Sequence, residues 1–200
     1  MCSVCGITDF ENMGGTDIAE LSRMSGKMMW ENTERSSIYI TANAGLCCNR
    51  ETGGGLSGIQ PMTVVFGRRI YTIIYSGRLR NADFLRNELK KSGAVFVTES
   101  DAEVIVYSYI VYGKHCPCKL QGSFVFCIYD EWGERLFVAR SKTGDKRLFY
   151  TFRCSAMLFA TERAALTDKG DLADEADGVY EIRRGYCGYF SARGLYMEKY

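Results

Sequence analysis

Short β-type runs recur along most of this chain, and their recurrence constrains its fold more than any other feature. The runs are rich in β-branched and aromatic residues and cover 37–41, 62–66, 70–75, 123–129, 135–139, 148–152, 157–160 and 178–182. Tight turn signals join several neighbouring runs, as at 67–69 and 130–133. Because connections this short return the chain beside itself, the sequence predicts antiparallel hairpins.

Three segments with helical spacing lie early and centrally among these runs. Each begins with a residue type that caps helices, namely Thr16, Asn81 and Ser100. Glu103 stands three residues after Ser100, as in a capping box. The expected helices cover 16–28, 81–93 and 100–113. Together with the hairpins, they predict an α+β architecture in which two antiparallel sheets lie between helical layers.

The composition bounds the domain count and excludes several classes of partner. A chain of 200 residues, 46% of them hydrophobic, can close one sizeable core, and no linker marks a boundary, so we expect a single domain over 1–200. Its 25 Lys and Arg nearly balance its 24 Asp and Glu, which leaves no bulk field to attract nucleic acid or an anionic membrane. No run approaches the roughly 18 apolar residues of a membrane span, and no leader-like segment is apparent. We therefore expect a cytoplasmic protein; the oligomeric state stays open.

Cys2 is the residue on which the chemistry depends. Methionine aminopeptidase removes Met1 when the next residue is small, so the mature chain is expected to begin at Cys2. A terminal cysteine holds its thiol beside a free α-amine whose reference pKa is about 7.7–8.0, so the amine can accept the thiol proton near neutral pH. One residue then supplies both nucleophile and base. Residues 3–8 are expected to form a strand that anchors this terminus.

The neighbours of Cys2 resemble those of a known family. Residues 1–7 are similar to the start of asparagine synthetases and related class II glutamine amidotransferases, and residues 58–62 to their Gly-x-Gln-Pro segment. Residues 120–130 and 135–140 resemble a family strand and its hairpin partner, so the likeness is collinear over almost the whole chain. It implies the four-layer αββα sandwich of N-terminal-nucleophile hydrolases. It also implies hydrolysis of glutamine through a thioester on the cysteine, without a cofactor.

The resemblance assigns roles to further residues. Arg50 aligns with the arginine that binds the α-carboxylate of glutamine, and Asp101 with the aspartate that binds its α-amine. The oxyanion hole of the family comes from an Asn-Gly pair followed by Glu, where this chain has Ser76, Gly77 and Arg78. Gly77 is retained, and the Ser76 hydroxyl is the remaining candidate for the second donor. Arg78 replaces an acid that helps to hold the substrate amine.

Other departures from the family pattern leave two functional hypotheses. The Arg-Gly-Pro-Asp stretch of the family falls at 30–36, which lacks its Gly and Pro, and the glycine-rich segment 53–58 is most simply a flexible turn. No pyrophosphate-binding loop of an ATP-using synthetase domain is present, so ammonia would pass to a synthetase-domain partner. The first hypothesis is an impaired glutaminase. The alternative is a degenerate or engineered, non-catalytic domain that serves as a binding module or scaffold.

The nine cysteines suggest a third, weaker hypothesis of a metal or redox module. His115, Cys116 and Cys118 offer part of a zinc site, but their spacing is not Cys-x-x-Cys, so we expect no metal and interpret the segment as a loop after the third helix. Vicinal Cys47 and Cys48 lie near the expected pocket, where redox sensitivity and two small thiols in a strand are the alternatives. The cysteines as a whole suit reduced, buried thiols better than a disulfide framework.

Overall fold

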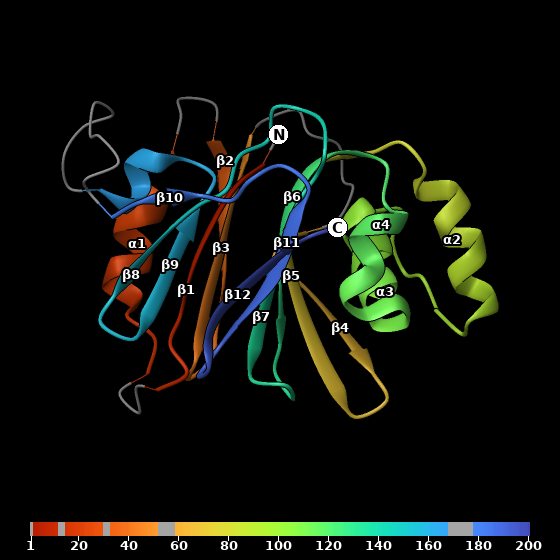
Figure 1. Ribbon diagram of the computed structural model, residues 1–200, viewed down its shortest axis with the longest axis horizontal. Helices are drawn as coiled ribbons and strands as arrows, with labels where there is room; N and C mark the ends of the chain where they lie inside the picture. The colour runs from red at the N-terminus through yellow and green to blue at the C-terminus, as the bar shows by residue number, and fades with distance from the viewer. Residues whose placement is uncertain (1, 12–14, 30–32, 52–58, 168–177) are drawn as a thin grey trace.

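The computed structural model describes residues 2–11, 15–29, 33–51, 59–167 and 178–200. Within these residues, two six-stranded antiparallel sheets pack face to face, and helices cover the outer side of each sheet (Figure 1). The predicted α+β architecture of two sheets between helical layers is therefore confirmed. The segment 53–58 lies outside the described residues, as does Met1.

The first sheet contains the strand that begins at Cys2. Its strands run in the order β10-β8-β9-β1-β3-β2. Their bounds are β1 (Cys2–Thr8), β2 (Thr33–Ile40), β3 (Ala44–Glu51), β8 (Phe149–Arg153), β9 (Ala156–Ala160) and β10 (Tyr180–Glu181). β1 pairs with β3 on one side and with β9 on the other, so the expected anchoring strand lies in the interior of the sheet.

The second sheet has the order β12-β11-β7-β6-β5-β4. Its bounds are β4 (Met62–Phe66), β5 (Arg69–Leu79), β6 (Gly122–Asp130), β7 (Arg135–Arg140), β11 (Tyr186–Ser191) and β12 (Gly194–Lys199). The hairpin of β11 and β12 was not among the predicted runs. β12 is an edge strand whose residues are all at least partly exposed, so its sequence lacks a buried apolar run that would have revealed it.

Helices cover both sheets, as Figure 1 shows with α1 outside the first sheet and α2, α3 and α4 outside the second. The bounds are α1 (Ile18–Lys27), α2 (Ala82–Lys91), α3 (Asp101–Tyr112) and α4 (Cys116–Lys119), with 3-10 turns η1 (Gly113–His115) and η2 (Arg163–Leu166). The segment expected to be a loop after the third helix is therefore helical at η1 and α4. None of the helices in the described part of the chain is long and apolar enough to cross a membrane.

Two of the predicted helix caps are wrong in detail. Asp17, and not Thr16, caps α1, because its carboxylate accepts from the Glu20 N–H at 2.9 Å. The Thr16 hydroxyl donates instead to the Thr41 carbonyl at 2.9 Å, which ties it to the sheet. Asn81 precedes α2 but makes no capping bond, because its side chain bonds the backbone at Lys119 and Gln121.

The cap of α3 is confirmed, whereas its capping box is not formed. The Ser100 hydroxyl accepts from the Ala102 N–H at 3.2 Å. The Glu103 carboxylate turns away from Ser100 and accepts from the backbone N–H groups of Val97 and Thr98 at 2.8 and 2.7 Å. Glu103 thereby satisfies donors of the preceding loop that would otherwise be left without partners.

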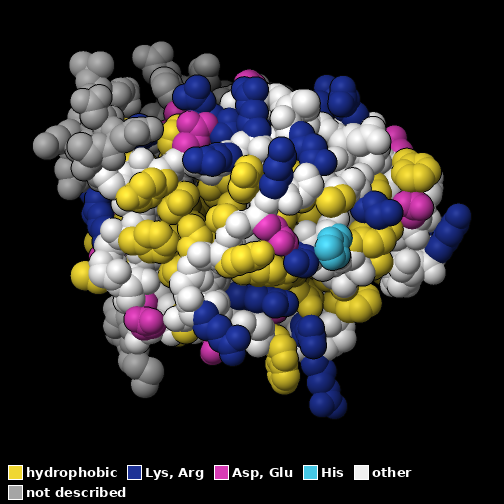
Figure 2. Space-filling view, in the orientation of Figure 1, with side chains coloured by type: hydrophobic (Ala, Val, Ile, Leu, Met, Phe, Trp, Pro, Cys, Tyr) yellow, Lys and Arg dark blue, Asp and Glu magenta, His cyan; other side chains and the backbone are white. Residues whose placement is uncertain are grey.

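Apolar side chains fill three layers, of which the middle one lies between the two sheets. Its members come from both sheets, and Val4, Cys48, Ile74, Val125 and Phe159 are among them. On the visible face, apolar side chains gather over the region where the edge strands β10 and β12 lie (Figure 2). Cys2 packs against the middle layer from its border and is half-buried, so a small molecule can reach it from solvent.

Candidate active site

The alternation of side chains along β1 determines the face of the sheet on which the Cys2 side chain lies. Val4 belongs to the middle apolar layer, whereas Cys5 and Ile7 pack with α1 on the outer side. Because side chains alternate along a strand, Cys2 faces the second sheet together with Val4. Gly6 continues this face, and a Cβ added there would lie 2.4 Å from the ring of Phe159, which is directly opposite on β9, so this ring requires glycine beside it.

Arg50 lies directly opposite Cys2 on the neighbouring strand. The antiparallel register of β1 and β3 pairs these two residues. Directly opposite residues leave the sheet on the same face, with Cβ atoms about 4.5–5.5 Å apart. The half-buried Arg50 side chain thus leaves the sheet on the same face as the Cys2 thiol.

Cys48 is the second thiol on this face. It precedes Arg50 by two residues on β3 and is 3% exposed. A hydrogen bond with the Cys2 thiol, followed by burial, raises the pKa of Cys48 well above its usual range, and the positive charge of Arg50 opposes this shift. The structure therefore places the Cys48 thiol in contact with Cys2, and of the two vicinal cysteines that the sequence set near the pocket, only Cys48 faces it.

Ser76 reaches Cys2 from the second sheet. Its hydroxyl donates to the Cys2 carbonyl at 2.5 Å and thereby fixes the first residue of β1 against β5. Gly77 follows with φ of +145°, and a Cβ there would meet the Ser123 carbonyl oxygen at 2.2 Å. Only glycine fits this conformation and this approach. Both residues that were predicted to form the oxyanion hole therefore lie on the strand segment that contacts Cys2.

Asp101, the first residue of α3, is tied to the same strand. Its Oδ2 atom accepts from the Leu79 N–H at 2.8 Å and from the Tyr75 hydroxyl at 3.1 Å. No bond to its Oδ1 atom is present among the described residues. Asp101 is half-buried, so this oxygen can accept from a ligand.

Tyr75 connects Asp101 with the rest of the site. The side chain is 5% exposed, and burial, followed by the negative charge of Asp101, raises the pKa of its phenol. Cys2 and the exposed Arg78 also act electrostatically on this phenol, so all four side chains share one region. Sequence reasoning missed Tyr75, and its position directly before Ser76 and Gly77 was the only available signal.

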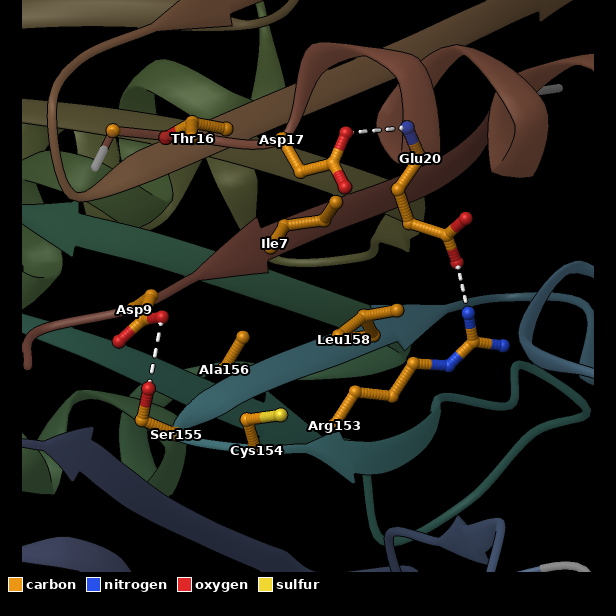
Figure 3. A pocket seen from close by; sticks show the side chains of 11 residues that line it. Ile7, Asp9, Thr16, Asp17, Glu20, Arg153, Cys154, Ser155, Ala156 and Leu158 are labelled. Atoms are coloured by element: carbon orange, nitrogen blue, oxygen red, sulfur yellow. Dashed lines mark hydrogen bonds and ion pairs between the residues drawn. The ribbon is translucent and has the colours of Figure 1, made fainter. Parts of the chain in front are cut away.

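The cavity drawn in Figure 3 is a different place. It has a volume of about 270 Å³ and lies on the outer side of the first sheet, at the end of β1 remote from Cys2. Its polar side chains bond one another, since Arg153 reaches Glu20 at 2.7 Å and the Ser155 hydroxyl reaches Asp9 at 3.0 Å (Figure 3). This cavity therefore provides no pocket for the nucleophile.

The remaining cysteines form neither disulfides nor a metal cluster among the described residues. Cys47 faces α1, opposite to Cys48, as alternation requires. Hydrogen bonds with Cys5 first, then with Ser25 and Ser36, lower the pKa of Cys47 to about 6, against the effect of burial. The two vicinal thiols therefore occupy separate environments, and only Cys48 reaches the candidate site.

This chain resembles known proteins in sequence and in fold. A family profile described as a glutamine amidotransferase domain matches residues 1–184. Glutamine-hydrolysing asparagine synthetase 3 of Bacillus subtilis (strain 168) is 30% identical over 223 residues, covering 100% of this chain and 36% of the relative. Asparagine synthetase 1 of the same organism is 36% identical over 174 residues, covering 83% of this chain and 26% of the relative. The chain thus spans about a third or less of the length of these relatives.

A solved structure shows the same fold at lower sequence identity. The glutamine phosphoribosylpyrophosphate amidotransferase of B. subtilis, complexed with ADP and GMP, matches with a TM-score of 0.78 and 18% identity. The match covers 99% of this chain and 49% of that chain. At this identity the likeness concerns the fold, which is the four-layer arrangement of two sheets between helices.

Proposed function

Because this chain belongs to the family of class II glutamine amidotransferase domains, we propose that it hydrolyses glutamine to glutamate and ammonia through a thioester on Cys2. The observation that carries the proposal is the pairing of Cys2 with Arg50 across β1 and β3. This pairing supports the proposal, because a guanidinium on the same sheet face as a nucleophilic sulfur suits a substrate that carries a carboxylate.

Each of the other site residues has its own role in the proposed reaction. After removal of Met1, the Cys2 amine takes the thiol proton and delivers it to the leaving ammonia, and water then hydrolyses the thioester. Arg50 binds the α-carboxylate of glutamine, and the Oδ1 atom of Asp101 accepts from its α-amine. The Gly77 N–H and the Ser76 hydroxyl bind the oxyanion of the tetrahedral intermediate.

The proposed activity is slow, because Ser76 has only one proton to donate. That proton is directed at the Cys2 carbonyl, so the hydroxyl must rotate before it can serve the oxyanion. Loss of one oxyanion donor typically costs about 10²–10³ in rate, or roughly 3–4 kcal/mol. Arg78 adds an exposed positive charge near the place where a substrate ammonium would bind.

The single proton of Ser76 and the positive charge of Arg78 also favour the rival function, which is a non-catalytic glutaminase-fold domain that binds a ligand or serves as a scaffold. In either case we propose that residues 1–200 act as a single domain in the cytoplasm. In the catalytic case, a synthetase domain receives the ammonia. The relatives named above are asparagine synthetases, and they are much longer than this chain.

Mass spectrometry and covalent labelling separate the two functions. We expect loss of Met1, labelling of Cys2 by a glutamine-mimicking electrophile, and release of glutamate from glutamine. Cys2→Ser is expected to abolish the labelling, whereas the control Cys118→Ser, at an exposed cysteine of α4, retains it. A mature chain that keeps Met1, or a Cys2 that resists the electrophile, would contradict the catalytic proposal and leave the binding function.

A further inference from the structure

The sheet register explains how a second thiol comes to lie beside the nucleophile. β1 and β3 pair Val4 with Cys48 and Cys2 with Arg50. Cys2 and Cys48 are therefore diagonal neighbours on the same face of the sheet, and their side chains share a hydrogen bond.

The two thiols differ in their access to solvent. Cys2 is half-buried at the border of the middle layer, whereas Cys48 is 3% exposed within it. A small oxidant therefore meets Cys2 first, and Cys48 is shielded until Cys2 has reacted. The other thiol pair of the sheet, Cys5 and Cys47, is also in register, but both residues are fully buried and are shielded on both sides.

We propose that Cys2 and Cys48 form a redox modification site, in which hydrogen peroxide converts the two thiols into a reversible disulfide that switches off the nucleophile. Its regulatory meaning rests on the proposed function. The Cys2 thiolate attacks one oxygen of the peroxide, the O–O bond breaks, and hydroxide leaves, which gives a sulfenic acid on Cys2. Cys48 then attacks the Cys2 sulfur, an S–S bond forms, the S–O bond breaks, and water leaves with the Cys48 proton.

The electrons balance over these two reaction steps. The two thiols lose two electrons in total, and the peroxide gains them and ends as hydroxide and water. A dithiol reductant reverses the modification by exchange and restores Cys2. Formation of the disulfide also protects Cys2 from further oxidation to sulfinic acid, which most reductants leave unrepaired.

The test is intact-mass and peptide-mapping mass spectrometry of the purified full chain, treated with hydrogen peroxide and then with dithiothreitol. We expect the loss of two hydrogen masses and a peptide that joins Cys2 to Cys48, both reversed by the dithiol. Glutaminase activity should fall at least about tenfold and recover together with the thiols. In Cys48→Ser, excess peroxide should instead carry Cys2 through the sulfenic acid to the sulfinic acid, and activity should not return after dithiothreitol.

Cys127→Ala is the matched control, because Cys127 is a fully buried thiol of the same middle layer whose pKa is raised by burial alone. It should form the Cys2 to Cys48 bond as the unaltered chain does. Peroxide-treated protein that keeps all its thiol hydrogens, or a bond that joins Cys5 to Cys47 instead, would overturn the proposal. A correct disulfide in a chain with no glutaminase activity when reduced would refute the proposed function and uphold the modification site.

Discussion

Cys2 and Arg50 occupy directly opposite positions on the antiparallel strands β1 and β3, so the thiol and the guanidinium leave the sheet on the same face. β1 is held in this register on its other side by β9, and the Ser76 hydroxyl holds the Cys2 carbonyl from the second sheet. The relation between nucleophile and anchor therefore depends on the pairing of strands that are far apart in the sequence.

Substitution of Arg50 tests this relation. Arg50→Ala is expected to raise the KM for glutamine by about tenfold to a hundredfold, the size of a hydrogen bond to a charged group, with a smaller effect on kcat. Arg50→Lys keeps the charge but loses the bidentate geometry, so its KM for glutamine should lie between those of the unaltered chain and Arg50→Ala. Steady-state kinetics measure both. Arg80→Ala, at an exposed arginine just beyond β5, is the control, and an equal effect there would argue against a specific anchor.

Removal of the Tyr75 hydroxyl tests its positioning of Asp101. Tyr75→Phe loses the 3.1 Å bond to Asp101 Oδ2 but keeps the buried ring. We expect the KM for glutamine to rise about five- to tenfold with kcat nearly unchanged, as for the loss of one hydrogen bond that orients a binding group. Tyr71→Phe, in the same apolar layer, should leave both constants alone. A fall in kcat without a change in KM would place Tyr75 in another role.

Gly77 is expected to tolerate no side chain. In Gly77→Ala the new Cβ meets the Ser123 carbonyl, and φ of +145° is strained for alanine, so unfolding should require roughly 2–4 kcal/mol less. Urea unfolding followed by circular dichroism measures this. The control Gly26→Ala has open space within α1 and should be neutral or stabilising by up to about 1 kcal/mol. Equal stability of Gly77→Ala and the unaltered chain would refute the packing argument.

Glu20 should make stability depend on pH in the acid range. The hydrogen bond from Arg23, together with the charges of Arg153 and Arg23, lowers the pKa of Glu20 in the folded chain. A lowered pKa stabilises the fold above the unfolded value of about 4.3, and this contribution is lost as the pH falls through the folded pKa.

Thermal unfolding of Glu20→Gln checks the sign. The variant should be less stable than the unaltered chain at pH 7, by less than about 1 kcal/mol because solvent screens these pairs, and the difference should shrink as the pH falls below the unfolded value. Glu11→Gln, at an exposed carboxylate outside this cluster, is the matched control. A Glu20→Gln deficit that is the same at pH 7 and below the unfolded value would show that charge is not the cause.

Local patterns in the sequence determined the elements and the nucleophile. Alternating apolar runs predicted the strands on both sides of Gly67 and of residues 130–133, and N-cap residues such as Ser100 marked the helices. These signals act over a few neighbouring residues, so they can be recognised without the fold. The resemblance of the residues around Cys2 to a known family indicated that family and its site residues. Two of these residues, Arg50 and Ser76, lie next to Cys2 in the structure.

The tertiary structure decided what surrounds the nucleophile. Cys48 reaches Cys2 only through the register of β1 and β3, and Tyr75 reaches Asp101 only because α3 packs on β5. The same non-local contacts turned Asn81 away from its helix toward the backbone at Gln121. Strand register and packing depend on residues that are distant in the chain, and a one-residue shift in register would turn every side chain to the opposite face. For that reason the sequence alone could name Cys2 and set Cys47 and Cys48 near the pocket, but it could not decide which of these two thiols faces Cys2, nor name the phenol of Tyr75.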